Sequence, residues 1–243
     1  GTIFIDTSAE VTLNLNNVTI TNQGIGTIDN RKSNKVIINL SEESNNILSD
    51  GSKSSATIKS VGDLFIEGSG NLLIYANNNN GINTNGNLVI NGGTIYVAAK
   101  NDAFSVIKEL LINSGKVIGI GNNTMKIPNE LSKQSTFLFN FSETFSENTT
   151  FSLTDNRNDY LFSFVALRDF KTLILSHSVL KEGSYHILKD IKCNGKLENG
   201  IYIDGDVSGG ERIYIGIADT FAIDGKSNWY GKKAINITNP DNF

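Results

Sequence analysis

Three copies of one short strand pattern occur at a nearly constant spacing, and this repeat constrains the fold more than any other feature of the chain. The copies begin at Asp63, Asn87 and Glu109, and each continues with two apolar residues and an isoleucine. A second apolar strand follows each copy, and turns rich in Gly, Asn and Ser separate the strands. The repeat shows no helical periodicity and consists of short strands separated by turns. It therefore predicts a solenoid, in which each coil buries its apolar side against its neighbours. Three residues 22 positions apart mark the second strands: Asn71, Gly93 and Gly115.

The expected fold is therefore all-β, a parallel β-helix. Successive side chains of a strand point to opposite sides, so one set of each copy should line the interior. Phe65, Val89 and Leu111 should point the other way. The expected buried ladders contain Leu64, Ile66, Leu88, Ile90, Leu110 and Ile112.

The sequence pattern changes after Pro128. Strands that alternate with period two follow, and turn clusters such as Asp155–Asp159 separate them, which is typical of antiparallel hairpins. We therefore expect parallel coils over residues 1–130, and antiparallel hairpins with C-terminal strands packed on the solenoid over residues 131–243.

Composition narrows the class of protein. The net charge is −4 and the sequence shows no cluster of basic residues, which argues against a nucleic-acid partner. Cys193 is the single cysteine, so neither an intrachain disulfide nor a cysteine-based metal site is expected. No run approaches the roughly 18 apolar residues of a membrane span. The chain opens directly on a strand-like segment, so no signal peptide is expected in it.

A column of polar turn residues is the candidate metal site. Asn80, Asp102 and Thr124 are each 22 residues apart, and equivalent positions in stacked coils lie about 4.7–4.9 Å apart. Oxygen side chains at that pitch can coordinate Ca²⁺, with Asp50 in the preceding coil as a second carboxylate. The alternative is a hydrogen-bonded ladder, because Asn and Asp suit tight turns and stacked amides satisfy one another.

Aromatic side chains are the candidate sugar contacts, because sugar rings stack on flat side chains. Tyr75 and Tyr96 occupy second strands of successive coils and form an aromatic step if both point outward; stacked core tyrosines are the alternative. Trp229 and Tyr230 follow a turn and are expected to be exposed, unless Trp229 packs under the C-terminus.

Signals for catalysis are weak. Proton abstraction beside a uronate needs a cationic group near calcium ligands, yet the lysines of the coil turns have no evident aspartate cluster around them. A glycosidase needs two carboxylates about 5–9.5 Å apart, and Asp50 with Asp102 is the one pair near that range. His177 and His186 have no nucleophile constellation with them. No catalytic residue is assigned.

The chain resembles the bacterial carbohydrate-binding domain-containing proteins related to pectate lyases. The resemblance lies in turn motifs that include Asn45–Gly51 (NNILSDG), Asp63–Gly70 (DLFIEGSG) and Leu88–Gly93 (LVINGG), and in a hairpin motif at Leu173–Tyr185 (LILSHSVLKEGSY). It implies a right-handed parallel β-helix, located outside the cell or on the bacterial cell surface, that binds acidic polysaccharide such as polygalacturonate, or cellulose, with calcium. Relatives carry Asp-Gly-Ile where this chain has Asn80-Gly81-Ile82 and Asp102-Ala103-Phe104, and losing a carboxylate weakens a calcium site.

The expected function is noncatalytic binding of a polysaccharide. Two alternatives stay open, a surface adhesin or structural solenoid without a glycan ligand, and a β-helical polysaccharide lyase.

Overall fold

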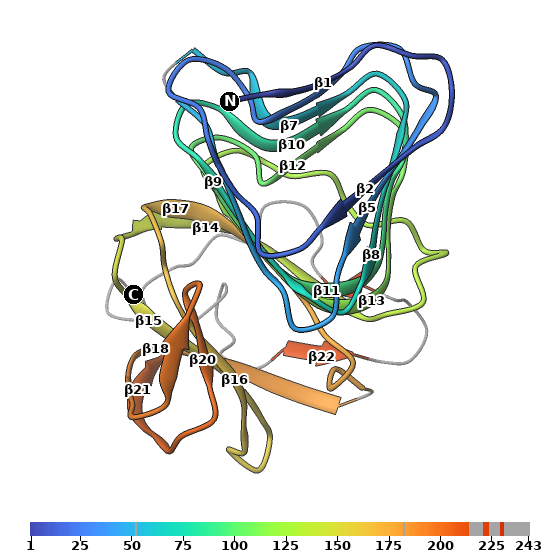
Figure 1. Cartoon of the computed structure of the whole chain (residues 1–243). Helices are drawn as coiled ribbons and strands as arrows, with labels where there is room; N and C mark the ends of the chain where they lie inside the picture. Colours follow the sequence, from blue (N-terminus) through green and yellow to red (C-terminus); the bar gives the residue numbers. More distant parts are fainter. Residues whose placement is uncertain (52, 182, 214–220, 224–228, 231–243) are drawn as a thin grey trace.

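The computed structural model describes residues 1–51, 53–181, 183–213, 221–223 and 229–230. In this part of the chain the regular structure is β only, and it contains no helix that could cross a membrane. Parallel strands stack as a solenoid of about five turns, and an antiparallel sheet follows it (Figure 1). The expectation of an all-β parallel solenoid followed by antiparallel strands is confirmed.

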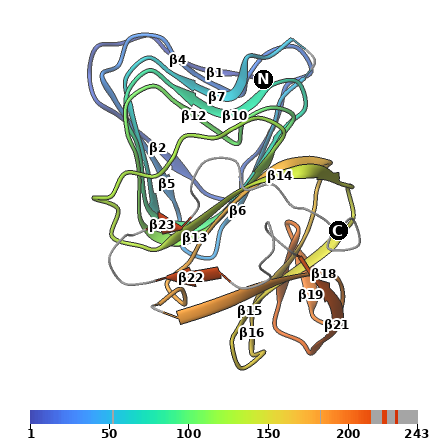
Figure 2. The ribbon, with the colours of Figure 1, turned by 180° about the vertical axis from the view of Figure 1, so that it is seen from behind.

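Each coil has three sides, which give the solenoid its three-sided outline in Figures 1 and 2. The first face contains β1 (Ile3–Ile5), β4 (Ile28–Asn30), β7 (Ala56–Ser60), β10 (Asn80–Thr84) and β12 (Phe104–Val106). The second face contains β2 (Val11–Leu15), β5 (Lys35–Leu40), β8 (Asp63–Gly68) and the first halves of β11 (Leu88–Ala99) and β13 (Leu110–Gly121). The third face contains β3 (Thr19–Thr21), β6 (Asn45–Ser49), β9 (Asn71–Ala76) and the second halves of β11 and β13.

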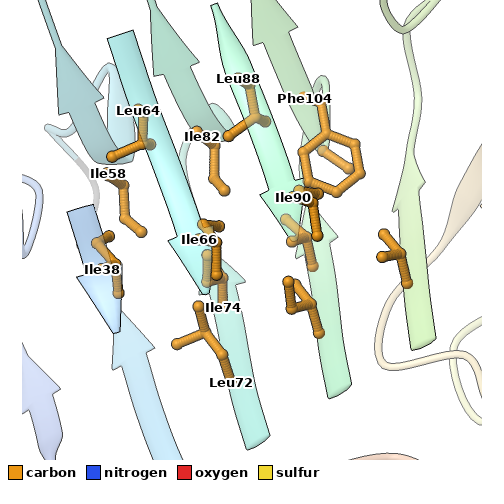
Figure 3. Packing of buried hydrophobic residues seen from close by; sticks show 14 of the residues in the cluster. Ile38, Ile58, Leu64, Ile66, Leu72, Ile74, Ile82, Leu88, Ile90 and Phe104 are labelled. Atoms are coloured by element: carbon orange, nitrogen blue, oxygen red, sulfur yellow. The ribbon is translucent and has the colours of Figure 1, made fainter. Parts of the chain in front are cut away.

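The interior is a set of aliphatic ladders that run along the solenoid axis (Figure 3). Leu64, Leu88 and Leu110 pair in register, as do Ile66, Ile90 and Ile112, and all six are fully buried. Phe65, Val89 and Leu111 lie between them in sequence and point outward. The predicted ladders and their direction are confirmed. A side-chain period of two means that a slip of one residue would turn Leu64, Ile66 and their ladder partners to the outside, so burial of these residues fixes the register.

The antiparallel strands continue the third face beyond the last coil. β17 (Phe170–Ser176) pairs antiparallel with β13, and β14 (Thr136–Phe145) pairs with β17. The backbone of β23 (Trp229–Tyr230) pairs with β14. A further sheet packs against the outward side of these strands and of the third face, and forms a second hydrophobic core there. It contains β15 (Thr150–Asp155), β16 (Tyr160–Val165), β18 (Gly183–Cys193), β19 (Lys196–Glu198), β20 (Ile201–Ile203), β21 (Val207–Arg212) and β22 (Phe221–Ile223).

Two details differ from expectation. Asn71 pairs with Thr94 rather than with Gly93. Leu88 lies 24 residues after its partner Leu64, and the corner from Leu88 to Thr94 is one residue shorter than the corner from Leu64 to Asn71, so the offset on the third face is 23. The motif at Leu173–Tyr185 is not a hairpin, since β17 pairs with β13 and β14, whereas β18 pairs with β15 and β21. The loop in this motif is closed instead by the Tyr185 hydroxyl, which accepts a hydrogen bond from the Lys181 N–H (2.7 Å) and donates one to the Lys181 carbonyl (2.8 Å).

Candidate functional site: a cleft around Lys116

Lys116 stands where the solenoid meets the antiparallel sheet. It follows Gly115, whose φ of +99° turns β13 around the corner between the second and third faces. Three cavities share Lys116 as a lining residue, with volumes of about 210, 650 and 490 Å³. We call them together the Lys116 cleft.

The walls of the Lys116 cleft combine aromatic, amide and hydroxyl groups. The smallest cavity lies over Tyr96 and Thr94 and is bounded by Glu198 and Asn199. The largest lies along β16 and the turn before β21, with Tyr160 and Tyr202 among its lining residues. The third lies over the glycine corner; its lining residues include Gly92, Gly93, Ser114, His177 and Ser178. Flat rings beside hydrogen-bonding groups suit a polyhydroxylated ligand.

The charge of Lys116 is held in a partly desolvated place. Burial lowers the pKa of its ammonium group, and its Nζ lies 5.7 Å from the centre of the Phe162 ring. None of the ion pairs among the described residues includes Lys116, although Glu198 and Asp159 line the same cavities. Desolvation, aided by the Lys116 charge, lowers the pKa of His177 to about 4. At neutral pH the cleft therefore presents an ammonium group beside a neutral imidazole, and the side chains of Asp159, Glu198, Asp204 and Asp206 also line it.

The turn column lies elsewhere, at the corner before the first face. Asn80 and Asp102 occupy adjacent coils, and the Asp102 N–H donates to Asn80 Oδ1 (3.1 Å), which is a contact of a ladder. In the preceding coil, the residue that pairs with Asn80 is Ala56, which has no side-chain oxygen to extend the column. Asp102 Oδ1 is buried without a hydrogen-bond partner, and burial raises the pKa of its carboxyl group. The described residues contain no group of three or more His, Cys, Asp or Glu that could hold a metal ion.

Asp50 is not part of that column. Its side chain is 3 % exposed, and its Oδ1 accepts the Asn77 N–H at 2.6 Å. Its Oδ2 is buried without a hydrogen-bond partner, as is Thr57 Oγ1. Burial raises the pKa of Asp50. The carboxylate thus fastens the corner of one coil to the next coil, and the expectation that it adds to an Asn80–Asp102 site is not supported by any contact among the described residues.

Tyr75 and Tyr96 both point out of the solenoid, toward the second core, and they do not form an exposed step. Tyr96 is 1 % exposed, and its hydroxyl donates to the Val165 carbonyl (2.7 Å). Tyr75 is half-buried, and its hydroxyl donates to the Leu167 carbonyl (3.1 Å). Both bonds reach the antiparallel sheet or the loop after β16. Tyr96 is therefore too buried to stack on a sugar, although it is a lining residue of the smallest cavity. The side chains of Trp229 and Tyr230 lie outside the described residues.

Residues 1–138, more than half of the chain, match the carbohydrate-binding domain-containing protein family. The chain belongs to this family. A carbohydrate-binding domain-containing protein of Acetivibrio thermocellus is 38 % identical over 111 residues, which cover 41 % of this chain. The match covers 39 % of that relative, so the chain spans about two fifths of the relative's length. No solved structure matches this member of the family.

Lys116 was missed in the sequence. The sequence could have pointed to Lys116, because it is a charged residue at the start of the third face, where the two preceding coils have the uncharged Asn71 and Thr94. The cleft could not be inferred, because its other wall comes from residues 158–207.

Proposed function

We propose that this protein binds an acidic polysaccharide without chemically changing it, and that the Lys116 cleft holds the chain. The observation that carries the proposal is the half-buried ammonium group of Lys116, which has no ion-pair partner among the described residues although four carboxylates (Asp159, Glu198, Asp204 and Asp206) line the same cleft of rings, amides and hydroxyls. A uronate carboxylate would pair with the Lys116 ammonium group, and a charge-assisted bond in a partly dry site is stronger than one in water. Family membership supports carbohydrate as the ligand class.

The decisive experiment is affinity electrophoresis in polygalacturonate with Lys116→Met. The variant should bind about tenfold or more weakly, since a hydrogen bond to a charged group contributes about 1.5–3 kcal/mol. Lys59→Met, which removes an exposed lysine from β7, is the matched control and should leave binding unchanged. Equal affinities of the wild type and Lys116→Met would show that the acidic chain binds elsewhere.

The pH dependence of binding should carry the signature of Lys116. Because burial lowers the pKa of its ammonium group, affinity for polygalacturonate should begin to fall below the ordinary lysine pKa of about 10.4 as the pH rises. A binding curve that stays flat to pH 10 would contradict pairing with Lys116.

A second candidate function is β-elimination, and one observation favours it. Burial and the Lys116 charge lower the pKa of His177 to about 4. The imidazole is therefore neutral at neutral pH, which is the form in which a histidine can act as a general base. Lyase action on polygalacturonate creates an unsaturated product that absorbs in the ultraviolet. We expect no such absorbance; its appearance, and its loss in His177→Gln, would replace binding by catalysis.

We further propose that calcium binds weakly at Asp102, at a place separate from the Lys116 cleft. The free Asp102 Oδ1 fits a hard cation, whereas Asn80 Oδ1 already accepts a backbone N–H, so water and sugar oxygens would complete the 6–8 ligands that Ca²⁺ takes. Wild-type protein should then melt higher with calcium than with chelator, and Asp102→Asn should abolish the difference. The same melting temperature in both conditions would leave Asp102 a ladder residue.

An exported or cell-surface location is part of the proposal, because acidic polysaccharides of this kind are extracellular polymers. Fractionation of the native cells with an antibody would test it, and recovery of the protein in the cytoplasm alone would contradict it.

A further inference from the structure

The outward side of the second face carries an apolar stripe that is separate from the Lys116 cleft. Ile37 pairs with Phe65, Phe65 with Val89, and Val89 with Leu111, so these four side chains form one column across β5, β8, β11 and β13. All four are half-buried, and neither hydrophobic cluster among the described residues includes them. We call this column the Phe65 stripe. Strands β2, β5 and β8 lie on the side away from β15, β18 and β21 in both views (Figures 1 and 2).

Two polar rows run along the Phe65 stripe, one on each side. The first is a row of mostly amide residues, in which Asn113 Nδ2 donates to Asn91 Oδ1 (2.9 Å) and Asn91 Nδ2 to Glu67 Oε1 (3.3 Å). In the second row, Asn87 Nδ2 donates to Asp63 Oδ1 (3.2 Å), and the Glu109 N–H donates to Asn87 Oδ1 (3.1 Å). These bonds hold the rows in fixed positions, so little side-chain entropy remains to be lost on binding. The rows are Asn14, Asn39, Glu67, Asn91 and Asn113 on one side, and Lys35, Asp63, Asn87 and Glu109 on the other; Asn91 and Asn113 are joined by their side chains, because a register shift pairs the Asn91 backbone with Ser114.

We propose that the Phe65 stripe binds a neutral polysaccharide chain, which lies along the solenoid axis across the strands. The proposal rests on the proposed function only for carbohydrate as the class of ligand. The C–H face of a sugar ring would pack on the Phe65 stripe, and its hydroxyl groups at the ring's edges would bond the amides and carboxylates of the two rows. Each amide keeps a donor or an acceptor free for this, because an amide group offers two of each.

Charge selects a neutral chain over an acidic one at this surface. The two rows contain the carboxylates of Asp63, Glu67 and Glu109 against the single ammonium group of Lys35, whose Nζ pairs with Glu10 (2.9 Å). A polyuronate would meet like charge here, and like-charge juxtaposition opposes binding. Carboxylates also line the Lys116 cleft, namely Asp159, Glu198, Asp204 and Asp206. The difference between the two sites is that the ammonium group of Lys35 is already paired with Glu10, whereas no ion pair among the described residues includes Lys116, so only the cleft offers an unpaired cation to a uronate.

A second copy of the chain is a poorer occupant. Four half-buried side chains in a single column offer little area, and a stable protein–protein contact buries about 800 Å² on each partner. A second copy would also bring the carboxylates of its own rows close to those of the first. A narrow ligand with an apolar face and polar edges fits the stripe better.

The test is affinity electrophoresis in soluble neutral polysaccharides (a β-glucan, a glucomannan and a xylan free of uronate), with polygalacturonate run in parallel. Phe65→Ala should bind the neutral chain about tenfold more weakly, as expected when one aromatic contact and its burial are lost, and should bind polygalacturonate as the wild type does. Lys116→Met should show the reverse. Phe4→Ala is the matched control, because Phe4 is a 49 % exposed ring on the first face with a cation over it, as Lys35 lies over Phe65; it should change neither affinity.

Several outcomes would overturn the proposal. If the wild type binds polygalacturonate but none of the neutral chains, the Phe65 stripe is not a sugar site and the proposed function stands. If Phe65→Ala melts at a lower temperature than the wild type, Val89→Lys is used in its place, because it puts a charge in the middle of the apolar stripe. Binding of the neutral chain by Val89→Lys as tight as that of the wild type would contradict the proposal. If the wild type sediments as a dimer that Phe65→Ala dissociates, the stripe is a contact between copies.

Discussion

Asp50 and Lys116 are both ionisable side chains that are largely or partly buried, and they differ in whether a ligand can reach them. The Asp50 carboxylate accepts one backbone N–H and leaves its second oxygen unpartnered. The Lys116 ammonium group faces a cleft from which a ligand can reach it. A buried charge that a ligand cannot reach is structural, whereas one that borders a cleft is a candidate for binding.

Asp50 should stabilise the fold as a hydrogen-bond acceptor and destabilise it as a charge. Its raised pKa means that the folded state prefers the protonated carboxyl group, so stability is largest below the ordinary pKa of about 3.9 and falls as the pH rises through the raised pKa. Asp50→Asn should therefore be at least as stable as the wild type at pH 7. Asp50→Ala should lose about 1–3 kcal/mol, because it leaves the Asn77 N–H without its acceptor. Urea unfolding of both variants at pH 4 and pH 7 measures this, and an unstable Asp50→Asn would contradict it.

His177 should weaken the fold in mild acid. Its pKa of about 4 lies below the ordinary value of 6.5, so the stability that it contributes is fully present above pH 6.5 and is lost as the pH falls toward 4. The melting temperature of His177→Gln should fall less than that of the wild type between pH 7 and pH 4.5. Parallel curves for the two proteins would show that His177 does not titrate in the way its surroundings indicate.

At the scale of the strand, the solenoid depends on register, and its corners adjust that register. The alternation of buried and outward residues in β8, β11 and β13 sets which side chains stack. The offset between the coils of β8 and β11 is 24 residues on the second face and 23 on the third, so Tyr75 pairs with Ala98 and Tyr96 pairs with Leu73. Glycine is favoured at position 93, because its φ of +84° is a conformation that L side chains rarely adopt.

A charge in one ladder should destabilise several coils together. Ile90→Asp places an unpaired carboxylate at a fully buried position between Ile66 and Ile112, and should cost about 3–5 kcal/mol. Val89→Asp, next to it in the chain but outward, is the matched control and should cost about 1 kcal/mol or less. Denaturant unfolding of both variants compares them, and equal losses would contradict the assigned direction of the strand.

At the scale of the whole molecule, the wall between the solenoid and the antiparallel sheet is apolar on both sides. Side chains on one side of β17 and β14, such as Ile174 and Leu138, belong to the solenoid core, and their neighbours Leu175 and Phe139 belong to the second core. One layer of strands therefore serves two cores. Tyr96 ties the layers together, since its hydroxyl donates to the Val165 carbonyl and accepts the Leu167 N–H at 3.3 Å.

Removal of the Tyr96 hydroxyl should weaken the junction of the two parts. Tyr96→Phe removes a buried hydrogen-bond partner from two backbone groups and should cost about 1–3 kcal/mol. Tyr75→Phe loses one bond from a half-buried ring and should cost less. Calorimetry of both variants measures the loss, and a smaller effect for Tyr96→Phe than for Tyr75→Phe would contradict this account of the junction.

The sequence by itself determined the parallel coils, the direction of Leu64, Ile66, Leu88 and Ile90, and the change to antiparallel strands. These features follow from alternation and from a repeat that each coil shares with its nearest neighbours, so they are written in short stretches of the chain. Only the tertiary structure decided which outer face is covered, and with it the burial of Tyr96, the Lys116 cleft and the exposure of the Phe65 stripe. The physical reason is that Tyr96 and Val165 are 69 residues apart, and a contact over that separation is set by the packing of whole sheets, which no local pattern encodes.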